Sequence, residues 1–476
     1  MIRSDLTELS AKELAAGYRA KDFTAREVVQ AHLSRIEKEN PRLNAYLEVF
    51  DDALEGADKI DALLAKDPNG VHALAGVPIA IKDNILIEGK KASAGSKILE
   101  NHIATYDATA IARLKRTGAL FLGRTNMDEF AMGSSTENSA FGPSKNPIDD
   151  TRSPGGSSGG SASAVAGHLA TIGLGTDTGG SVRQPAALCG LYGFKPTYGA
   201  ISRYGLIAMG SSLDQLGVLA RSVDDVEAVF DTVSGQDPRD STTLPASSLQ
   251  LSASTSKRIG VPRDFVKDAQ PETVASFEKS LKTLTKEGYE IVDIDLPVAP
   301  HALAAYYIVM PAEVSTNLAR FDGMRYGLHK EGATLLEEYK KSRAEGFGPE
   351  TRRRIMLGTY VLSSGYHDAY YNRATALRSA LVKEFDAVFE QVSFIATPTS
   401  PGPAFVIGEK PDPISMYLED IFTVSANLAG TPALSVPFGE VSEGGKDLPV
   451  GVQFMSQRGN DAALFPVARD IMRSRA

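Results

Sequence analysis

The sequence of 476 residues contains no run of 18 or more apolar residues, the length that a helix needs to cross a bilayer. Its first residues, MIRSDLTELSAKEL, have no apolar core and no small-residue cleavage site, so no secretory signal is expected there. We therefore predict a cytoplasmic protein that makes no membrane contact.

Cysteine is nearly absent, and the single Cys189 cannot form an internal disulfide, which agrees with a reducing compartment. Its apolar surroundings, AALCG, favour a buried structural thiol over a nucleophile. The seven histidines are scattered, and neither HExxH nor CxxC spacing occurs. We predict no metal site and no cofactor in this chain.

Basic residues are fewer than acidic ones, 50 against 59, so the formal net charge is −9. An acidic balance disfavours long-range attraction to phosphate backbones, so the chain alone should bind nucleic acid poorly. The composition is otherwise ordinary, with 42% hydrophobic and 23% charged residues, as expected of a folded globular protein. Any role on a nucleic acid would need a partner.

Short apolar runs alternate with helical patterns through the first half of the chain. Two capping boxes, Ser10 with Glu13 and Thr24 with Glu27, predict helices within the first forty residues. Strands are predicted at 77–82, 119–125 and 171–177, and helices at 107–118 and 161–170. This alternation predicts the α/β class, a sheet covered by helices on both faces.

The second half has longer helical patterns, at 222–235 and 271–288, followed by a strand-like segment at 289–295. Residues from about 300 to 390 are expected to form a helical layer or subdomain. Short strands broken by proline and glycine are expected at 394–401, 427–439 and 448–455, closing the same sheet. We therefore expect residues 1–476 to form one domain.

The segment 153–167, SPGGSSGGSASAVAG, has the composition of a flexible linker. A small-residue helix and an apolar strand follow it directly, however, which favours a loop packed inside a domain. Its GGSSG also matches the GxSxG nucleophile elbow of α/β-hydrolases, but no strong strand precedes it. Both alternatives are therefore disfavoured.

A second glycine-serine loop runs from Gly175 to Gly190 and has adjacent glycines before Ser181. Consecutive backbone N–H groups in such a turn can converge on one point, as a developing oxyanion requires. The candidate donors belong to Thr178, Gly179, Gly180 and Ser181. Taken alone, the loop is better explained as a tight turn.

Lys82 ends the apolar run at 77–82, where its strand should draw it out of water. A buried ammonium is costly unless it is paired or loses its proton. Pairing with the adjacent Asp83 would make it structural. A neutral amine would instead be a base able to take a proton from a serine hydroxyl.

Together these three segments resemble the amidase signature family, whose hallmarks are a lysine, a serine in GGSSGGS and a nucleophilic serine in TDxGGS. The separations match as well, with 75 residues from Lys82 to Ser157 and 24 from Ser157 to Ser181. The resemblance implies a large twisted mixed β-sheet between helices. It also implies Ser181 as nucleophile, Ser157 as proton relay with a non-proline cis peptide bond, and Lys82 as base.

Further phrases, at 126–142, 195–215, 320–327 and 363–371, resemble the glutaminase (A) subunits of glutamyl-tRNA(Gln) amidotransferases. This resemblance implies hydrolysis of glutamine to glutamate and ammonia through an acyl-enzyme. It further implies that Arg354 binds the glutamine carboxylate and that Asp420 binds its ammonium. Tyr306, or its neighbour Tyr307, is expected to line the same pocket.

The same subfamily implies a heterotrimer with B and C subunits. The B subunit would bind tRNA, ATP and Mg²⁺ and use the ammonia to amidate Glu-tRNA(Gln), Asp-tRNA(Asn) or both. Two other functions remain open from the residues: a stand-alone amidase with the same Lys82, Ser157 and Ser181, and a non-catalytic scaffold for a tRNA-binding partner. Retention of all three residues argues against the scaffold.

Overall fold

A computed structural model describes residues 5–249 and 256–473. Within these residues the strands form one sheet in the order β1-β3-β2-β4-β6-β5-β10-β11-β9-β7-β8. Strand β2 pairs in parallel with both β3 and β4, whereas β4 and β6 are antiparallel. The predicted α/β class with a large mixed sheet is confirmed. The strands are β1 Tyr46–Val49, β2 Pro78–Lys82, β3 Leu120–Thr125, β4 Ile172–Asp177, β5 Tyr192–Lys195, β6 Gln215–Ala220, β7 Arg258–Val261, β8 Glu290–Asp293, β9 Phe394–Pro398, β10 Ala433–Glu443 and β11 Lys446–Met455.

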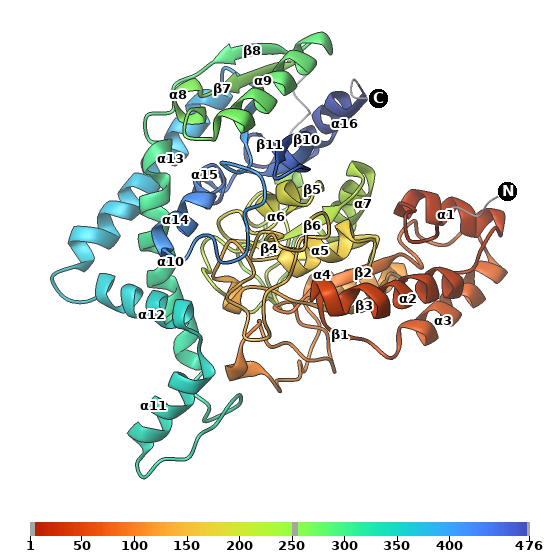
Figure 1. Cartoon of the computed structure of the whole chain (residues 1–476), viewed down its shortest axis with the longest axis horizontal. Coiled ribbons are helices and arrows are strands. Elements are labelled where there is room, and N and C mark those ends of the chain that lie inside the picture. Colours follow the sequence, from red (N-terminus) through yellow and green to blue (C-terminus); the bar gives the residue numbers. More distant parts are fainter. Residues whose placement is uncertain (1–4, 250–255, 474–476) are drawn as a thin grey trace.

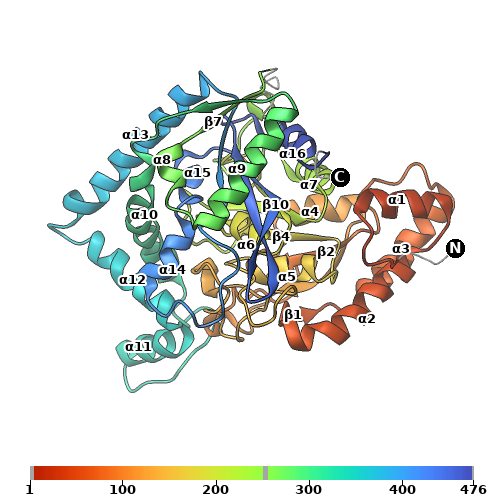
Figure 2. The same cartoon turned by 45° about the horizontal axis from the view of Figure 1, so that its top comes forward.

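Helices flank the sheet along its whole width (Figure 1, Figure 2). Helices α1 to α3 lie beside the β1 end, and α8 and α9 lie beside the β8 end. The α-helices of the described ranges are α1 Ala11–Ala20, α2 Ala25–Leu43, α3 Ala53–Lys66, α4 Thr109–Thr117, α5 Gly159–Ala166, α6 Arg183–Leu188, α7 Val223–Val233, α8 Arg263–Val266, α9 Pro271–Lys286, α10 Ala302–Asn317, α11 Leu335–Gly346, α12 Pro349–Val361, α13 Asn372–Phe389, α14 Pro413–Tyr417, α15 Val424–Ala429 and α16 Leu464–Arg473.

Strand β6 shows how the two faces of the sheet are covered. Its residues Leu216 and Val218 belong to the large core that also contains residues of α7 and α16. Leu219, which points to the other face, packs instead in a small cluster with residues of α5 and α6. The two loops with candidate catalytic serines are therefore held by short helices on one face of the sheet.

Most of the predicted elements of the first half are present. Both capping boxes form, with Ser10 and Thr24 accepting from the backbone N–H of Glu13 and Glu27. The predicted strands correspond to β2, β3 and β4, and the predicted helices to α4 and α5. Strands β1, β5, β6 and β7 were not predicted.

The segment 427–439 was predicted to be a strand, and this is wrong for its first residues. Helix α15 continues to Ala429 and ends at Gly430, whose φ of +73° forms a left-handed C-cap. Strand β10 begins at Ala433 and is eleven residues long, forming a hairpin with β11. Gly430 and Pro432 therefore follow the end of a helix, and within β10 the register with β11 shifts between Pro437 and Glu440.

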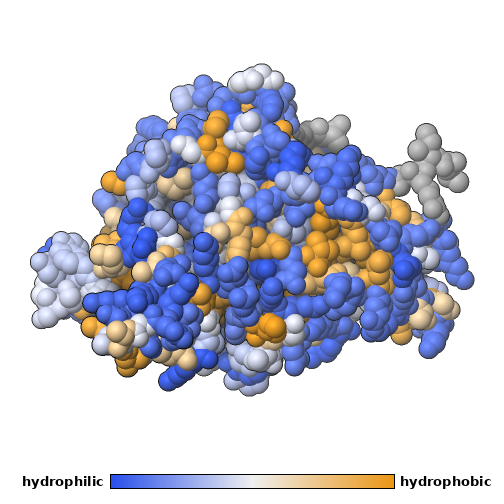
Figure 3. Space-filling model, turned by 60° about the horizontal axis from the view of Figure 1, so that its bottom comes forward, coloured by the Kyte–Doolittle hydropathy of each residue, from blue (hydrophilic) through white to orange (hydrophobic). Residues whose placement is uncertain are grey.

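Helices α10 to α13 occupy most of the segment from about 300 to 390. Helices α10, α12 and α13 share a second core with α15 and with residues of the loop around Phe130, and Phe347, the C-cap residue of α11, joins the same core. Helix α11 extends furthest from the sheet (Figure 1). The face in Figure 3 is predominantly hydrophilic, with smaller apolar areas between, and none of the helices described is long and apolar enough to span a membrane.

Candidate active site

Lys82, at the carboxyl end of β2, is fully buried, with 0% of its surface exposed. Its Nζ lies 2.8 Å from Ser157 Oγ, 2.9 Å from Ser158 Oγ and 2.9 Å from Thr176 Oγ1. Asp83 is not its partner, because that carboxylate binds the Arg124 guanidinium at 2.9 Å. The lysine is therefore surrounded by hydroxyl groups, and the alternative of a pair with Asp83 is wrong.

The environment of Lys82 lowers the pKa of its amine to about 7. Burial is the main cause, because it disfavours the charged form. The carboxylates of Asp128, Asp177 and Asp214 raise this pKa and only partly offset the burial. A large fraction of the amine is consequently neutral near pH 7 and able to accept a proton.

The contacts around Lys82 indicate where the lone pair of a neutral amine would point. Ser158 Oγ donates to the Thr176 carbonyl oxygen at 3.2 Å, so it accepts from Lys82 Nζ. The same carbonyl oxygen can only accept, and it lies 3.3 Å from Nζ. With its two N–H groups donated in this way, the amine has its lone pair left for one of the two other hydroxyls, Ser157 Oγ at 2.8 Å or Thr176 Oγ1 at 2.9 Å.

Ser157 is fully buried and follows a non-proline cis peptide bond between Gly156 and Ser157, as the family resemblance implied. The N–H of Gly156 donates to Gln184 Oε1 at 3.0 Å. Gly155 has a φ of +83°, and an added Cβ there would lie 2.7 Å from the Cα of Pro185. The glycines before Ser157 therefore allow the loop to pack closely against α6.

Ser181 lies in the loop after β4, and its carbonyl oxygen accepts from the N–H of Ser158 at 3.1 Å. This bond joins the two glycine-serine loops. Ser181 is 8% exposed, whereas Ser157 and Lys82 are both 0% exposed. Within residues 5–249 and 256–473 the Ser181 hydroxyl makes no hydrogen bond. It is therefore the most accessible of the three groups and is free to react.

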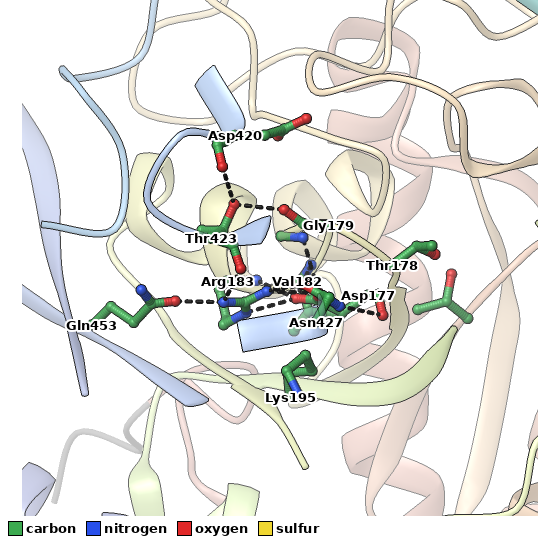
Figure 4. A network of polar contacts seen from close by, with 12 residues as sticks. Asp177, Thr178, Gly179, Val182, Arg183, Lys195, Asp420, Thr423, Asn427 and Gln453 are labelled. Atoms are coloured by element: carbon green, nitrogen blue, oxygen red, sulfur yellow. Dashed lines mark hydrogen bonds and ion pairs between the residues drawn. The ribbon is translucent and has the colours of Figure 1, made fainter. Parts of the chain in front are cut away.

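The loop before Ser181 is held by a buried ion pair between Asp177 and Arg183 (Figure 4). The guanidinium of Arg183 donates to both carboxylate oxygens, at 3.0 and 2.9 Å. It also donates to Asn427 Oδ1 at 2.6 Å and to the Thr423 carbonyl oxygen at 3.0 Å. Residues far along the chain thus fix the shape of this loop, and sequence patterns did not reveal them.

The predicted set of oxyanion donors requires one correction. The N–H of Gly180 donates to Asp177 Oδ1 at 2.9 Å, so it is already used within the loop. The N–H groups of Thr178, Gly179 and Ser181 have no such partner in the part of the chain that the structure describes. These three N–H groups remain the candidates for an oxyanion hole, and Gly180, with a φ of +135°, shapes the turn.

A charged pair of side chains comes from the C-terminal half of the chain. Arg354 on α12 is 3% exposed, and Asp420, which ends a short 3₁₀ helix at Leu418–Asp420, is 7% exposed. Asp420 Oδ1 accepts from Ser134 Oγ at 2.8 Å. Burial raises the pKa of Asp420 to about 7, although hydrogen bonds from Ser134 and Tyr307 and the charge of Arg354 act to lower it.

The two neighbouring tyrosines of α10 occupy different places. Tyr307 donates to Asp420 Oδ2 at 2.9 Å, and its ring centre lies 5.4 Å from the Arg354 guanidinium. Tyr306 packs on the loop before Ser181, so that a Cβ added at Gly179 would lie 2.6 Å from its ring. Tyr307 thus joins the charged pair, and Tyr306 lies beside the candidate oxyanion hole.

A short chain of hydrogen bonds connects the charged pair with the loop of Ser157. Ser134, which binds Asp420, accepts from Gln184 Nε2 at its carbonyl oxygen, at 3.0 Å. Gln184 in turn accepts from Gly156 N–H. The structure therefore brings all the predicted residues into one region, and adds Ser134, Thr176 and Gln184, which were not predicted. Ser134 lies within one of the phrases that carried the family resemblance.

The single cysteine takes no part in this region. Cys189 is 3% exposed, and its thiol donates to the Pro154 carbonyl oxygen, so the predicted burial is confirmed. Burial also raises the pKa of this thiol, which makes it a poor nucleophile.

No cluster of three or more histidine, cysteine, aspartate or glutamate side chains suited to a metal ion occurs among the described residues.

The mixed sheet, with a buried lysine beside two glycine-serine loops, has the features of an amidase. The family model described as Amidase matches residues 27–465. The chain belongs to the Amidase family, and the interpretation of the sequence motifs is confirmed at this level.

The curated relatives include the A subunit of the glutamyl-tRNA(Gln) amidotransferase of Sulfurihydrogenibium sp. (strain YO3AOP1), which is 49% identical over 98% of this chain and 96% of its own length. The protein of the same name from Koribacter versatilis (strain Ellin345) is 47% identical, with 98% of each chain covered. Similarity over nearly the full length of both chains extends to the segments that carry Lys82, Arg354 and Asp420.

Solved structures give the same result for the fold. The A subunit of the glutamyl-tRNA(Gln) amidotransferase from Thermotoga maritima superposes with a TM-score of 0.80 and 38% identity, covering 99% of this chain and 96% of that one. A peptide amidase from Stenotrophomonas maltophilia superposes with a TM-score of 0.81 and 30% identity, covering 98% and 97%. One fold thus serves enzymes named for different amides, and the substrate has to be argued from the site.

Proposed function

We propose that this chain is the glutaminase subunit of a tRNA-dependent amidotransferase, and that Lys82, Ser157 and Ser181 are its catalytic residues. The observation that carries the chemistry is Lys82 Nζ, buried among hydroxyl groups and 2.8 Å from Ser157 Oγ. A neutral amine in that place supplies the base that a serine nucleophile needs. The names of the full-length relatives support the choice of glutamine and of the tRNA-dependent reaction.

In the proposed mechanism Ser181 Oγ attacks the carboxamide carbon of glutamine. Its proton passes to Ser157 Oγ, which gives its own proton to neutral Lys82. The negative oxygen of the tetrahedral intermediate accepts from the N–H groups of Thr178, Gly179 and Ser181, each typically worth about 3 kcal/mol. The proton then returns through Ser157 to the leaving nitrogen, ammonia departs and a glutamyl ester remains on Ser181. Water hydrolyses this ester by the same proton route, releasing glutamate.

Recognition of glutamine is assigned to the charged pair. Free glutamine carries a carboxylate and an ammonium at a fixed separation, and the site offers one cation and one anion. Arg354 binds the carboxylate and Asp420 the ammonium, with Tyr307 holding the Asp420 carboxylate in place. Tyr306 forms the wall of the pocket beside Gly179. A simple amide without charges gains nothing from this pair.

Ammonia released here needs a consumer, because free ammonia is mostly protonated at neutral pH. The proposed function therefore includes B and C subunits in a heterotrimer in the cytoplasm. The B subunit would bind tRNA, ATP and Mg²⁺ and amidate Glu-tRNA(Gln), Asp-tRNA(Asn) or both. This part of the proposal is supported by the relatives, which are named as subunits.

Ammonia release from glutamine and from butyramide tests the catalytic and substrate assignments together. The wild-type chain, with any subunits that co-purify, is expected to prefer glutamine strongly. Ser181→Ala should abolish activity on both amides, and Arg354→Ala should remove most of the preference while butyramide turnover persists. Arg352→Ala, a change at an exposed neighbour on α12, is the matched control and should change neither rate.

Two outcomes contradict the proposal, and they do so in different ways. Equal turnover of both amides by the wild type, unaffected by Arg354→Ala, would identify a stand-alone amidase, an activity that the similarity to a peptide amidase also accommodates. Unchanged glutamine hydrolysis in Ser181→Ala would instead contradict the nucleophile. If that hydrolysis were found in a co-purifying subunit, this chain would be its scaffold.

A further inference from the structure

Arg354 is held by a residue one turn earlier on the same helix. Its Nε donates to Glu350 Oε1 at 2.8 Å, and Glu350 is itself only 8% exposed. Its other hydrogen bond within the described residues is weak, from Nη1 to Met310 Sδ at 3.7 Å. Because Glu350 occupies the Nε edge alone, the end of the guanidinium with Nη1 and Nη2 stays available for a two-bond contact with a carboxylate.

Glu350 also accepts from a second group of the same region, the hydroxyl of Tyr417, at 2.8 Å. The Tyr417 ring stacks on the Tyr307 ring, with centres 3.9 Å apart and planes 20° from parallel. The Arg354 guanidinium lies 5.4 Å from the centre of the Tyr307 ring and 5.3 Å from that of Tyr417. Both rings are thus placed against the same buried cation.

These contacts connect Arg354 with Asp420 through an unbroken series of neighbouring side chains. On one side Glu350 and Tyr417 hold Arg354, and on the other Tyr307 donates to Asp420. The stacked rings join the two sides. A shift of either ring would therefore change the separation between cation and anion, which is the property that distinguishes glutamine from other amides.

We propose that Glu350 and Tyr417 are positioning residues for substrate selection, which fix the separation of Arg354 and Asp420 and so select amides that carry both a carboxylate and an ammonium. This inference rests on the proposed glutaminase function and assigns two further residues to it. Neither side chain takes part in proton transfer, since the contacts of Glu350 are to Arg353, Arg354 and Tyr417.

The design of the substitutions follows from the contacts. Glu350→Gln keeps the volume and removes the charge beside Arg354. Tyr417→Phe keeps the ring that stacks on Tyr307 and removes only the hydroxyl. Arg353→Ala is the matched control, because Arg353 also contacts Glu350 but its side chain is 49% exposed.

The experiment measures kcat and KM of the full chain, with any co-purifying subunits, on glutamine and on butyramide. Glu350→Gln and Tyr417→Phe are each expected to raise KM for glutamine about tenfold with kcat within about twofold, a loss of binding shared by ground state and transition state. Turnover of butyramide should stay within about twofold, and so should both substrates in Arg353→Ala. In the double variant Glu350→Gln/Arg354→Ala, KM for glutamine should rise by less than the product of the two single-variant rises, because both substitutions act through one contact.

Binding provides a readout that does not depend on turnover. In a Ser181→Ala background, calorimetry should show glutamine binding that weakens about tenfold on adding Glu350→Gln. Equal losses on glutamine and butyramide would show a merely structural role and overturn the inference, as would an unchanged KM and Kd for glutamine. If wild-type turnover of glutamine did not depend on Arg354 at all, the proposed function itself would fail, which is a separate outcome.

Discussion

At the scale of single residues, the proposed mechanism depends on the protonation state of Lys82. Burial lowers the pKa of this amine to about 7, and it serves as a base only when neutral. We therefore expect kcat to be constant above about pH 8 and to fall about tenfold per pH unit below about pH 6. Initial rates at saturating glutamine between pH 5 and 9 provide the measurement.

The ionisation of Asp420 adds a second pH dependence, which acts in the same direction. Its carboxyl group, with a pKa of about 7, binds an ammonium only when ionised, so glutamine affinity should also fall below pH 7. The ratio kcat/KM for glutamine should then fall more steeply with acid than that for butyramide, which has no ammonium. A flat kcat between pH 5.5 and 8 would contradict the assignment of Lys82 as the base.

The candidate site was predictable at those residues where motif and spacing coincide. Lys82, Ser157 and Ser181 stand in three motifs with the family's separations, and the structure brings their loops together. The choice between Tyr306 and Tyr307 was not predictable, because it depends on how α10 is rotated against α12 and α14. Nor was the use of the Gly180 N–H by Asp177, because adjacent glycines in a sequence do not reveal which N–H points inward.

At the scale of elements, α12 carries both Glu350 and Arg354, so its placement determines the charged pocket. Its first turn is anchored by Glu129, whose Oε2 accepts from the N–H of Gly348, the N-cap residue, at 2.7 Å. The same carboxylate accepts from the hydroxyls of Ser96 and Thr351. A carboxylate at a helix N-terminus is further stabilised by the helix dipole.

Glu129→Gln is expected to weaken this anchor, because the new amide offers N–H groups where three donors already converge. An unmatched buried donor costs about 1–3 kcal/mol, so the free energy of unfolding in urea should fall by about that amount. KM for glutamine should rise as α12 loses its fixed position. The capping variant Ser10→Ala, on distant α1, should lower stability by about 1 kcal/mol without changing KM. An unchanged KM in Glu129→Gln would show that α12 is held by its other contacts.

Elements with local signals were predictable, and elements defined by distant pairing were not. Helices α1 and α2 begin at capping boxes, which the sequence shows directly. Strand β5 is only four residues long and pairs with β10, whose residues lie far later in the chain. In the segment 427–439, Gly430 and Pro432 lie between the end of α15 and the start of β10. Their local signal does not distinguish a helix end from a break in a strand, and the pairing of β10 with distant strands decides between the two.

At the scale of the whole molecule, the site is assembled from segments that lie far apart in the chain. Arg183, two residues after Ser181, binds Asn427 and Gln453 on the C-terminal segments. Strand β10 joins the two parts of the sheet by pairing with β5 on one side and β11 on the other. Proper folding of the loop that carries Ser181 therefore depends on these C-terminal segments.

The charge of the whole molecule decides what it can bind without partners. With 59 acidic and 50 basic residues, it repels a phosphate backbone at long range. We therefore expect the isolated chain to show no complex with tRNA at about 10 μM in roughly 0.15 M salt, whereas a complex with its partner subunits should bind and should weaken as salt is raised. Filter binding with labelled tRNA, on chain shown to be folded by glutamine binding, makes the comparison. A salt-sensitive complex formed by the isolated chain would show that part of its own surface contacts the RNA.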